Sequence, residues 1–153
     1  MKVYRISKCE FISDLQGTGA ARYSGRWHSK GTYILYTAGS PSLALLESVV
    51  HLSNIVVASY CMICLSVPED KIKTIAAEEL PANWFVNPPA DILKRIGDEF
   101  IRENKFLVLK IPSAIMPEES NYLLNPGHPD FKEVTEVYTR AIPIDERFLK
   151  KGQ

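Results

Sequence analysis

The chain has 153 residues, and its 18 Lys and Arg residues balance its 18 Asp and Glu residues, so its formal net charge is zero with neutral histidines. Proteins that bind nucleic acid by neutralising phosphates usually carry net basic charge, and disordered chains combine high net charge with few large apolar residues. With 46% hydrophobic residues, a chain of this length buries about two-thirds of its unfolded surface. We therefore expect one globular domain, over residues 1–153, that does not bind nucleic acid directly.

The N-terminal residues and the cysteines predict the compartment. The first residues contain no apolar signal-peptide core, and every apolar stretch is far shorter than the roughly 18 residues that span a bilayer. The three cysteines, Cys9, Cys61 and Cys64, are odd in number and sparse for a secreted scaffold. We therefore expect a cytoplasmic protein with no membrane segment and no disulfide framework.

The first half of the chain predicts two strands, a long loop between them and a helix. A strand begins at residues 3–6, and residues 16–31 have no sustained period, which indicates a loop with short ordered pieces. β-branched and aromatic residues predict a strand at 32–37. A helix follows, with Ser40 as its N-cap and a proline at its first position, and its apolar spacing extends to about His51.

The second half predicts more strands than helices. Residues 55–67 are nearly all apolar, which is typical of a strand buried on both faces, and residues 91–104 have the apolar spacing of a helix. Strands are expected at 106–111 and within 134–144, with turn residues around an apolar centre at 113–129. Since the connections do not follow a βαβ rhythm, we expect a single compact α+β domain with a mixed or antiparallel sheet.

The segment 22–31 is the densest polar and aromatic stretch, and it precedes the strand expected at 32–37. One of its arginines could bind phosphate through the planar donor fork of the guanidinium, with Gly25 allowing close backbone approach and Trp27 offering a stacking surface. A solvated basic loop with Trp27 anchored in the core explains the same residues. The pattern alone leaves both interpretations open.

Glu47 lies one helical turn from both Leu43 and Val50, at the margin of the apolar side of its helix. A buried carboxylate is costly unless it is paired or hydrogen-bonded. An arginine from the preceding loop could pair with Glu47 structurally, or a cationic reaction centre could use its charge. Structural pairing or simple partial exposure explains the position of Glu47 at least as well as catalysis does.

A third polar cluster lies in the last third of the chain. Ser113 follows the strand expected at 106–111, and Asn121 and Asn125 lie in the turn-rich segment after it. These neutral hydrogen-bonding side chains could orient a ligand, and capping of turns explains them equally well.

The remaining motifs do not complete a known site. Cys61 and Cys64 would point to opposite faces of a strand, with no second pair to complete a zinc set, so we interpret them as core cysteines. The Gly-Thr-Gly at 17–19 lacks the third glycine of a dinucleotide loop. The three histidines form no His-Glu-x-x-His pattern, and no serine lies in a Gly-x-Ser-x-Gly elbow. We therefore expect no metal ion and no bound cofactor.

Six short motifs, taken in order, resemble the RES-domain family, and the match runs almost from end to end. They are Tyr4-Arg5-Ile6, Gly25-Arg26-Trp27-His28, Leu35-Tyr36-Thr37-Ala38, Ala44-Leu45-Leu46-Glu47, Pro112-Ser113-Ala114 and Asn121-Tyr122-Leu123-Leu124-Asn125-Pro126-x-His128-Pro129-Asp130-Phe131. The family is named for an Arg, a Glu and a Ser, and its members are toxins of bacterial RES-Xre toxin-antitoxin modules. The resemblance implies one RES domain over residues 1–153 with a fold related to ADP-ribosyltransferases.

The resemblance also implies residue roles. Arg26, Glu47 and Ser113 match the three residues of the family name and are expected to be catalytic. Glu47 would stabilise positive charge on a ribose, Arg26 would hold a pyrophosphate and Ser113 would position the ribose. Four further residues are expected to contact the substrate, with Tyr36 packing against one of its rings: Arg5, Tyr36, Asn121 and Asn125. His28 stands where many relatives have Asn.

The activity implied by the resemblance is consumption of NAD+ as a substrate, by cleavage of the bond between nicotinamide and ribose through hydrolysis or phosphorolysis, which arrests growth. The implied partner is an Xre-type helix-turn-helix antitoxin, in a hetero-oligomer with the toxin. Transfer of ADP-ribose to a protein is an alternative with the same fold. A non-catalytic dinucleotide-binding module is a second alternative.

Overall fold

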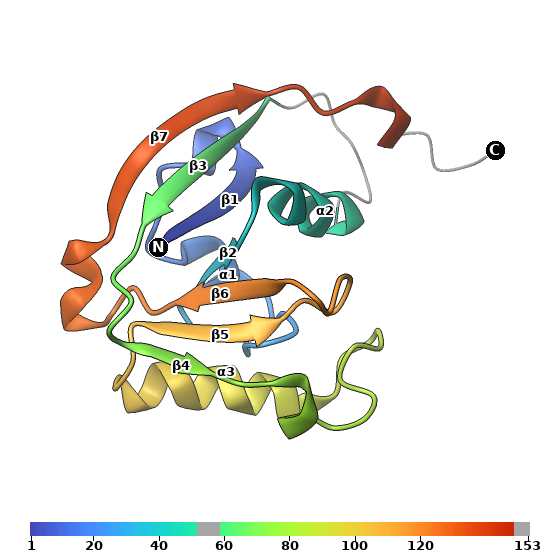
Figure 1. The fold of residues 1–153 in the computed structure, drawn as a ribbon, viewed down its shortest axis with the longest axis vertical. Helices are drawn as coiled ribbons and strands as arrows, with labels where there is room; N and C mark the ends of the chain where they lie inside the picture. Colours follow the sequence, from blue (N-terminus) through green and yellow to red (C-terminus); the bar gives the residue numbers. More distant parts are fainter. Residues whose placement is uncertain (52–58, 149–153) are drawn as a thin grey trace.

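A single mixed sheet organises the chain in the computed structural model, which describes residues 1–51 and 59–148. Within those residues the sheet has seven strands in the order β4-β5-β6-β2-β1-β3-β7 (Figure 1). Only β4 and β5 pair in parallel, and every other neighbouring pair is antiparallel. The strands are β1 (Lys2–Lys8), β2 (Leu35–Ala38), β3 (Tyr60–Ser66), β4 (Ile72–Thr74), β5 (Val108–Pro112), β6 (Ser120–Leu124) and β7 (Thr135–Ile142).

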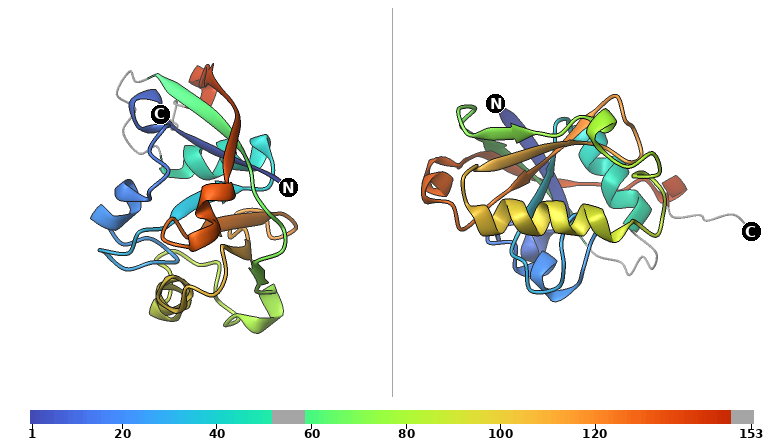
Figure 2. Two further views of the ribbon diagram at one scale, coloured as in Figure 1. Left: turned by 90° about the vertical axis from the view of Figure 1, so that its left-hand side faces the viewer. Right: turned by 90° about the horizontal axis from the view of Figure 1, so that it is seen from below.

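Two helices cover different parts of one face of this sheet. Helix α2 (Pro41–His51) packs on β1 and β2, whereas α3 (Asp91–Glu103) lies beside β4 and β5 in Figures 1 and 2 and packs on residues of β5 and β6. The Ser40 hydroxyl accepts a hydrogen bond from the Leu43 amide at 3.1 Å, which confirms the predicted N-cap. None of the helices in the described residues is long and apolar enough to cross a membrane.

Short helical segments complete the fold. They are α1 (Thr18–Arg22), η1 (Cys9–Phe11), η2 (Ala77–Glu79), η3 (Pro129–Glu133) and η4 (Glu146–Phe148). The second face of the sheet is buried under the segments around Ile12, Phe131 and Val134, which pack on apolar side chains of β1, β3 and β5. The α+β architecture expected from the sequence is therefore confirmed.

The sequence located most elements and missed two strands. The strand expected at 55–67 is observed as β3, buried along nearly its whole length, and residues 55–58 of that range lie outside the described residues. The strand expected at 32–37 begins only at Leu35. Residues 113–129, expected to form turns around an apolar centre, contain β6, and β4 was not predicted.

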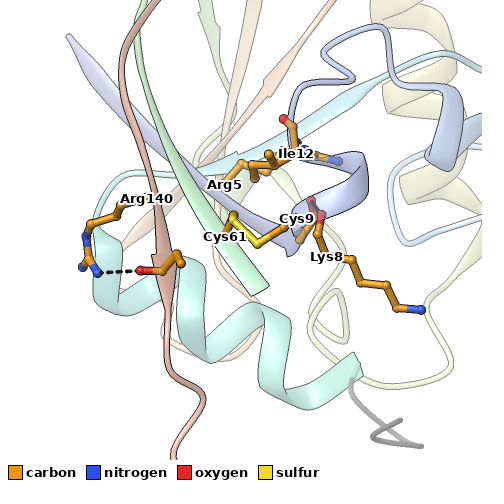
Figure 3. Close-up of a disulfide and its surroundings, with 8 residues drawn as sticks. Arg5, Lys8, Cys9, Ile12, Cys61 and Arg140 are labelled. Atoms are coloured by element: carbon orange, nitrogen blue, oxygen red, sulfur yellow. Dashed lines mark hydrogen bonds between the residues drawn. A yellow bond between two sulfur atoms is a disulfide. The ribbon is translucent and has the colours of Figure 1, made fainter. Parts of the chain in front are cut away.

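The expectation of no disulfide bond is wrong. Cys9 and Cys61 form one, with their Cα atoms 4.8 Å apart (Figure 3). The cause is the pairing of β1 with β3: Ser7 lies opposite Cys61, and Cys9, two residues further along the chain, points to the same side. Cys64 is a free, buried cysteine, as expected.

Candidate active site

Glu47 is the centre of a polar cluster built by three elements. Its Oε1 atom accepts hydrogen bonds from Ser113 Oγ at 2.8 Å and from Asn121 Nδ2 at 2.6 Å. The register of the sheet explains this meeting, because Asn121 lies opposite Ala38 in the neighbouring strand. Leu43, one helical turn before Glu47, packs on Ala38 and thereby holds this side of α2 over β6.

Ser113 is fully buried, and its hydrogen bonds fix the direction of its proton. The Oγ atom accepts from the backbone amides of Ile115 and Met116, both at 3.1 Å. Its hydroxyl hydrogen is therefore free to point only at Glu47. The chain reaches this geometry because β5 ends at Pro112 and turns at once into the connection to β6.

Arg26 lies on the loop before β2, and its guanidinium reaches a second loop. The Nη1 atom donates to the carbonyl oxygens of Trp84 and Val86, both at 2.9 Å. Partial burial lowers the pKa of Arg26, while the negative charge of Glu47 acts in the opposite direction. The guanidinium is thus within electrostatic reach of the carboxylate that Ser113 and Asn121 hold.

Tyr36, on β2, is partly buried and contacts the segment that carries Arg26. Its hydroxyl is 2.6 Å from Nδ1 of His28 and accepts a hydrogen bond from the Trp27 amide at 3.3 Å. Burial raises the pKa of Tyr36 far above its ordinary value, so the phenol keeps its proton. Its hydroxyl is therefore engaged by the segment that carries Arg26.

Two of the expected substrate contacts lie outside this cluster. Arg5 is on the opposite face of the sheet, beside Ile12 in Figure 3, and its Nη1 donates to the carbonyls of Phe11 at 3.3 Å and Ile12 at 3.2 Å. Burial lowers the pKa of Arg5, and the charge of Asp14 partly offsets this. The structure therefore gives Arg5 a bracing contact with η1 and does not bring it to Glu47.

Asn125 is buried one residue beyond the end of β6, whereas Asn121 lies near its start, about 13 Å away at the rise of a β-strand. Its Nδ2 donates to Asn104 Oδ1 at 2.8 Å, and its Oδ1 accepts from the Gly127 amide at 3.0 Å. These contacts join the end of α3 to a turn. The structure therefore separates the two asparagines that the sequence placed together.

Sequence reasoning missed several groups that hold the cluster in place. The carbonyls of Trp84 and Val86 carry no side-chain signature, so no pattern could have pointed to them. Asp98, on α3, accepts from the Ser29 amide at 2.9 Å and from Thr32 Oγ1 at 2.8 Å, and thereby ties the loop after Arg26 to the helix. An aspartate on an amphipathic helix is common, so the sequence alone does not indicate this contact.

The hydrogen bonds of the cluster leave one oxygen of Glu47 available to a ligand. Two neutral donors occupy Oε1 of Glu47, and within the described residues no hydrogen bond engages Oε2. A fixed carboxylate of this kind suits a substrate that develops positive charge in its transition state. Among residues 1–51 and 59–148, no group of three His, Cys, Asp or Glu side chains is arranged to hold a metal ion.

Comparison with known proteins decides the family. The family model described as RES domain matches residues 2–146. The chain belongs to the RES domain family. It is 35% identical to Toxin Res of Photorhabdus laumondii over 98% of both chains. It is also 34% identical to the Prs ADP-ribosylating toxin of a Sphingobium species, over 91% of this chain and 89% of that one.

The RES fold is also found in a solved structure. A chain of the M. tuberculosis MbcT-MbcA toxin-antitoxin complex superposes with a TM-score of 0.77, over 92% of this chain and 83% of that chain. The two chains are 14% identical. The likeness therefore lies in the fold, and it agrees with the seven-stranded sheet described above.

Proposed function

We propose that this RES-domain protein is the toxin of a bacterial toxin-antitoxin system and that it cleaves the nicotinamide-ribose bond of NAD+. The observation that carries the proposal is the carboxylate of Glu47, held on one oxygen by Ser113 and Asn121 and within electrostatic reach of Arg26. A dinucleotide presents the two matching charges: an anionic pyrophosphate, and a ribose that becomes cationic during cleavage.

The proposed step breaks the bond between C1′ of the ribose and the ring nitrogen of nicotinamide. The bonding electrons leave with nicotinamide, which departs neutral, and the positive charge passes to the ribose. Glu47 stabilises that charge through its free oxygen, Oε2. Water or phosphate then adds to C1′ and loses a proton, which yields ADP-ribose or its phosphorylated form. NAD+ is thus a consumed substrate, and the proposed step uses no cofactor and no metal.

The other residues of the cluster act on position. Arg26 offers its planar guanidinium to the pyrophosphate, where two donors can meet two phosphate oxygens. Ser113 and Asn121 hold Glu47, so the carboxylate meets the ribose without rearranging, which is where preorganised sites gain most of their rate. The roles assigned from the resemblance to Arg26 and Glu47 are retained in this proposal. Ser113 and Asn121 become residues that act through Glu47.

A protein acceptor in place of water is the second candidate, because one relative at 34% identity is an ADP-ribosylating toxin. Radiolabelled NAD+ distinguishes the two candidates. Label that stays on a protein band indicates transfer, whereas loss of bulk NAD+ without labelling indicates degradation.

The partner is proposed to be an Xre-type helix-turn-helix antitoxin in the cytoplasm. The likeness of the fold to a chain from a toxin-antitoxin complex supports an antitoxin, and the balanced charge of this chain agrees with DNA binding by the partner. Expression of the chain alone should arrest bacterial growth, and coexpression of the neighbouring reading frame should restore growth and yield a copurifying complex.

The direct test is incubation of purified protein with NAD+, followed by chromatography of nicotinamide and the second product. Formation of phosphorylated ADP-ribose only when phosphate is added would identify phosphorolysis. Glu47→Gln should slow nicotinamide release about 100-fold to 1,000-fold, as expected for a lost electrostatic contact in a preorganised site. Glu136→Gln, on exposed strand β7, is the matched control. Thermal stabilisation by NAD+ without any release would instead support a non-catalytic module.

A further inference from the structure

His28 is 4% exposed, and both of its ring nitrogens have partners. Nε2 lies 2.8 Å from the carbonyl oxygen of Ala20 and 2.7 Å from that of Tyr23. Because carbonyl oxygens only accept, Nε2 carries the hydrogen. In the neutral ring Nδ1 is then an acceptor, and its partner at 2.6 Å is the hydroxyl of Tyr36. The tautomer of His28 is assigned by its surroundings.

The Tyr36 hydroxyl extends this chain of hydrogen bonds to the neighbour of Arg26. It donates to His28 and accepts from the backbone amide of Trp27. Since burial raises the pKa of Tyr36, this donor persists across the physiological range. The hydrogen bonds therefore run from the Trp27 amide through Tyr36 and His28 to the carbonyls of Ala20 and Tyr23. They link residues on both sides of Arg26 to Tyr36, which lies on β2.

The packing around His28 leaves the segment little freedom. The Gly25 amide donates to the His28 carbonyl at 3.0 Å, which closes a turn that has Arg26 and Trp27 between its ends. A Cβ atom on Gly25 would lie 2.5 Å from Cε1 of His28 and 3.2 Å from the Tyr36 hydroxyl. Only glycine allows this close approach.

We infer that His28 and Tyr36 are positioning residues for Arg26: the buried imidazole and the phenol bonded to it fix the turn from which the guanidinium reaches the substrate. This inference rests on the proposed function, because it takes the pyrophosphate of NAD+ as the ligand of Arg26. Tyr36 then serves the site through its hydroxyl, and His28 serves it without touching the substrate.

Two variants remove the network from opposite ends. Tyr36→Phe deletes the hydroxyl, and His28→Leu deletes both ring nitrogens while keeping an apolar side chain in the core. Because Arg26 would bind the pyrophosphate equally in the ground state and the transition state, its displacement should raise KM for NAD+ about tenfold and leave kcat within about twofold. Thr37→Val is the matched control, since it removes a buried 2.6 Å hydrogen bond, to the Tyr122 carbonyl, from the adjacent strand residue.

A double-mutant cycle separates positioning from general destabilisation. If Tyr36 acts through Arg26, Tyr36→Phe should raise KM no further when Arg26 is already alanine. An equal rise in both backgrounds, or an unchanged KM in Tyr36→Phe and His28→Leu, overturns the inference. Rescue is the third readout, because His28→Asn offers the Tyr36 hydroxyl an acceptor and should recover part of the loss.

A measurement independent of activity keeps this inference distinct from the proposed function. Crystal structures of the wild type and Tyr36→Phe should show the Arg26 guanidinium displaced from the Trp84 and Val86 carbonyls in the variant. An unmoved guanidinium overturns the positioning role whether or not NAD+ is cleaved. Wild-type protein that releases no nicotinamide contradicts the proposed function and leaves the crystallographic test standing.

Discussion

Ser113 and Glu47 are 66 residues apart in the sequence and are joined by a 2.8 Å hydrogen bond in which the serine donates. Two backbone amides already occupy the acceptor side of Ser113 Oγ. A nucleophilic serine needs a base that removes its proton and an open path to the substrate, whereas Ser113 is fully buried. The hydroxyl therefore orients the carboxylate.

Replacement of Ser113 should slow the reaction without abolishing it. Ser113→Ala removes one of the two donors to Glu47, and Asn121 still holds the same oxygen. We expect nicotinamide release to fall about 10-fold to 100-fold, which is less than the full loss of an electrostatic contact. The two amides left without an acceptor should cost about 1–3 kcal/mol of stability. Initial rates and urea denaturation measure the two effects. Complete inactivity in a variant of unchanged stability would point to a nucleophilic serine instead.

Asn121→Asp tests the contact on the other side of Glu47. The substitution places a second carboxyl group where the amide nitrogen now lies, 2.6 Å from Glu47 Oε1. Two carboxylates this close share a proton, so the pKa of one of them rises. We expect low activity at pH 8 and partial recovery as the pH falls, because the protonated aspartic acid donates as asparagine does. Asn121→Ala is the control and should show no such recovery in the same pH series.

The fold was more accessible from the sequence than the site. Local signals were sufficient for α2 and α3, where a serine cap and apolar spacing mark the helices. They failed for β6, because a five-residue strand between turn residues has little periodicity of its own. It pairs with β5, which directly precedes it in the chain, and with β2, which lies far away, so local signals alone do not locate it.

The site shows the same division between local and long-range information. Glu47 was located by its place on a helix and Ser113 by its place after a strand, and the resemblance singled out Arg26 among the arginines of its loop. The disulfide between Cys9 and Cys61 escaped because 52 residues separate its ends and only the register of β1 with β3 brings them together. Arg5 and Asn125 were grouped with the site because their motifs match, yet motif order does not specify the face of the sheet or the end of the strand.

Reduction of the disulfide should destabilise the domain. In the chain-entropy account, a crosslink between residues 52 positions apart contributes about 4 kcal/mol. We expect Cys9→Ala to lower the free energy of unfolding in urea and to remove the effect of added dithiothreitol. Cys64→Ala is the control, since Cys64 is free and its loss should leave the dithiothreitol effect intact. Peptide mapping without reductant should recover the Cys9–Cys61 pair, and equal stability with and without dithiothreitol in the wild type would contradict its contribution.

Asp98 should make the Arg26 loop sensitive to acid. Burial alone would raise the pKa of Asp98, but hydrogen bonds from Ser29 and Thr32 outweigh it and the pKa lies below the ordinary 3.8. A carboxyl whose folded pKa is lowered stabilises the fold above its unfolded pKa and loses that contribution as the pH falls through the folded value. We therefore expect Asp98→Asn to reduce stability at pH 6 and to differ less from the wild type below pH 3.8. Urea denaturation at pH 6 and below pH 3.8 measures the free energy of unfolding of both proteins. A difference between them that does not change with pH would exclude the linkage.

Gly97→Ala should destabilise the protein although it places a better helix former in α3. A Cβ atom at this position would lie 1.7 Å from the carbonyl oxygen of Trp27, which is backbone and cannot turn away. Overpacking of this kind costs about 1–3 kcal/mol and exceeds the gain of up to about 1 kcal/mol in helix propensity. Gly19→Ala, in α1, meets no atom within 4 Å and should leave stability unchanged or raised.

Because Trp27 adjoins Arg26, relief of the clash should also move the guanidinium and raise KM for NAD+, whereas Gly19→Ala should leave KM unchanged. A stable Gly97→Ala variant with wild-type KM would show that helix and turn can separate at no cost.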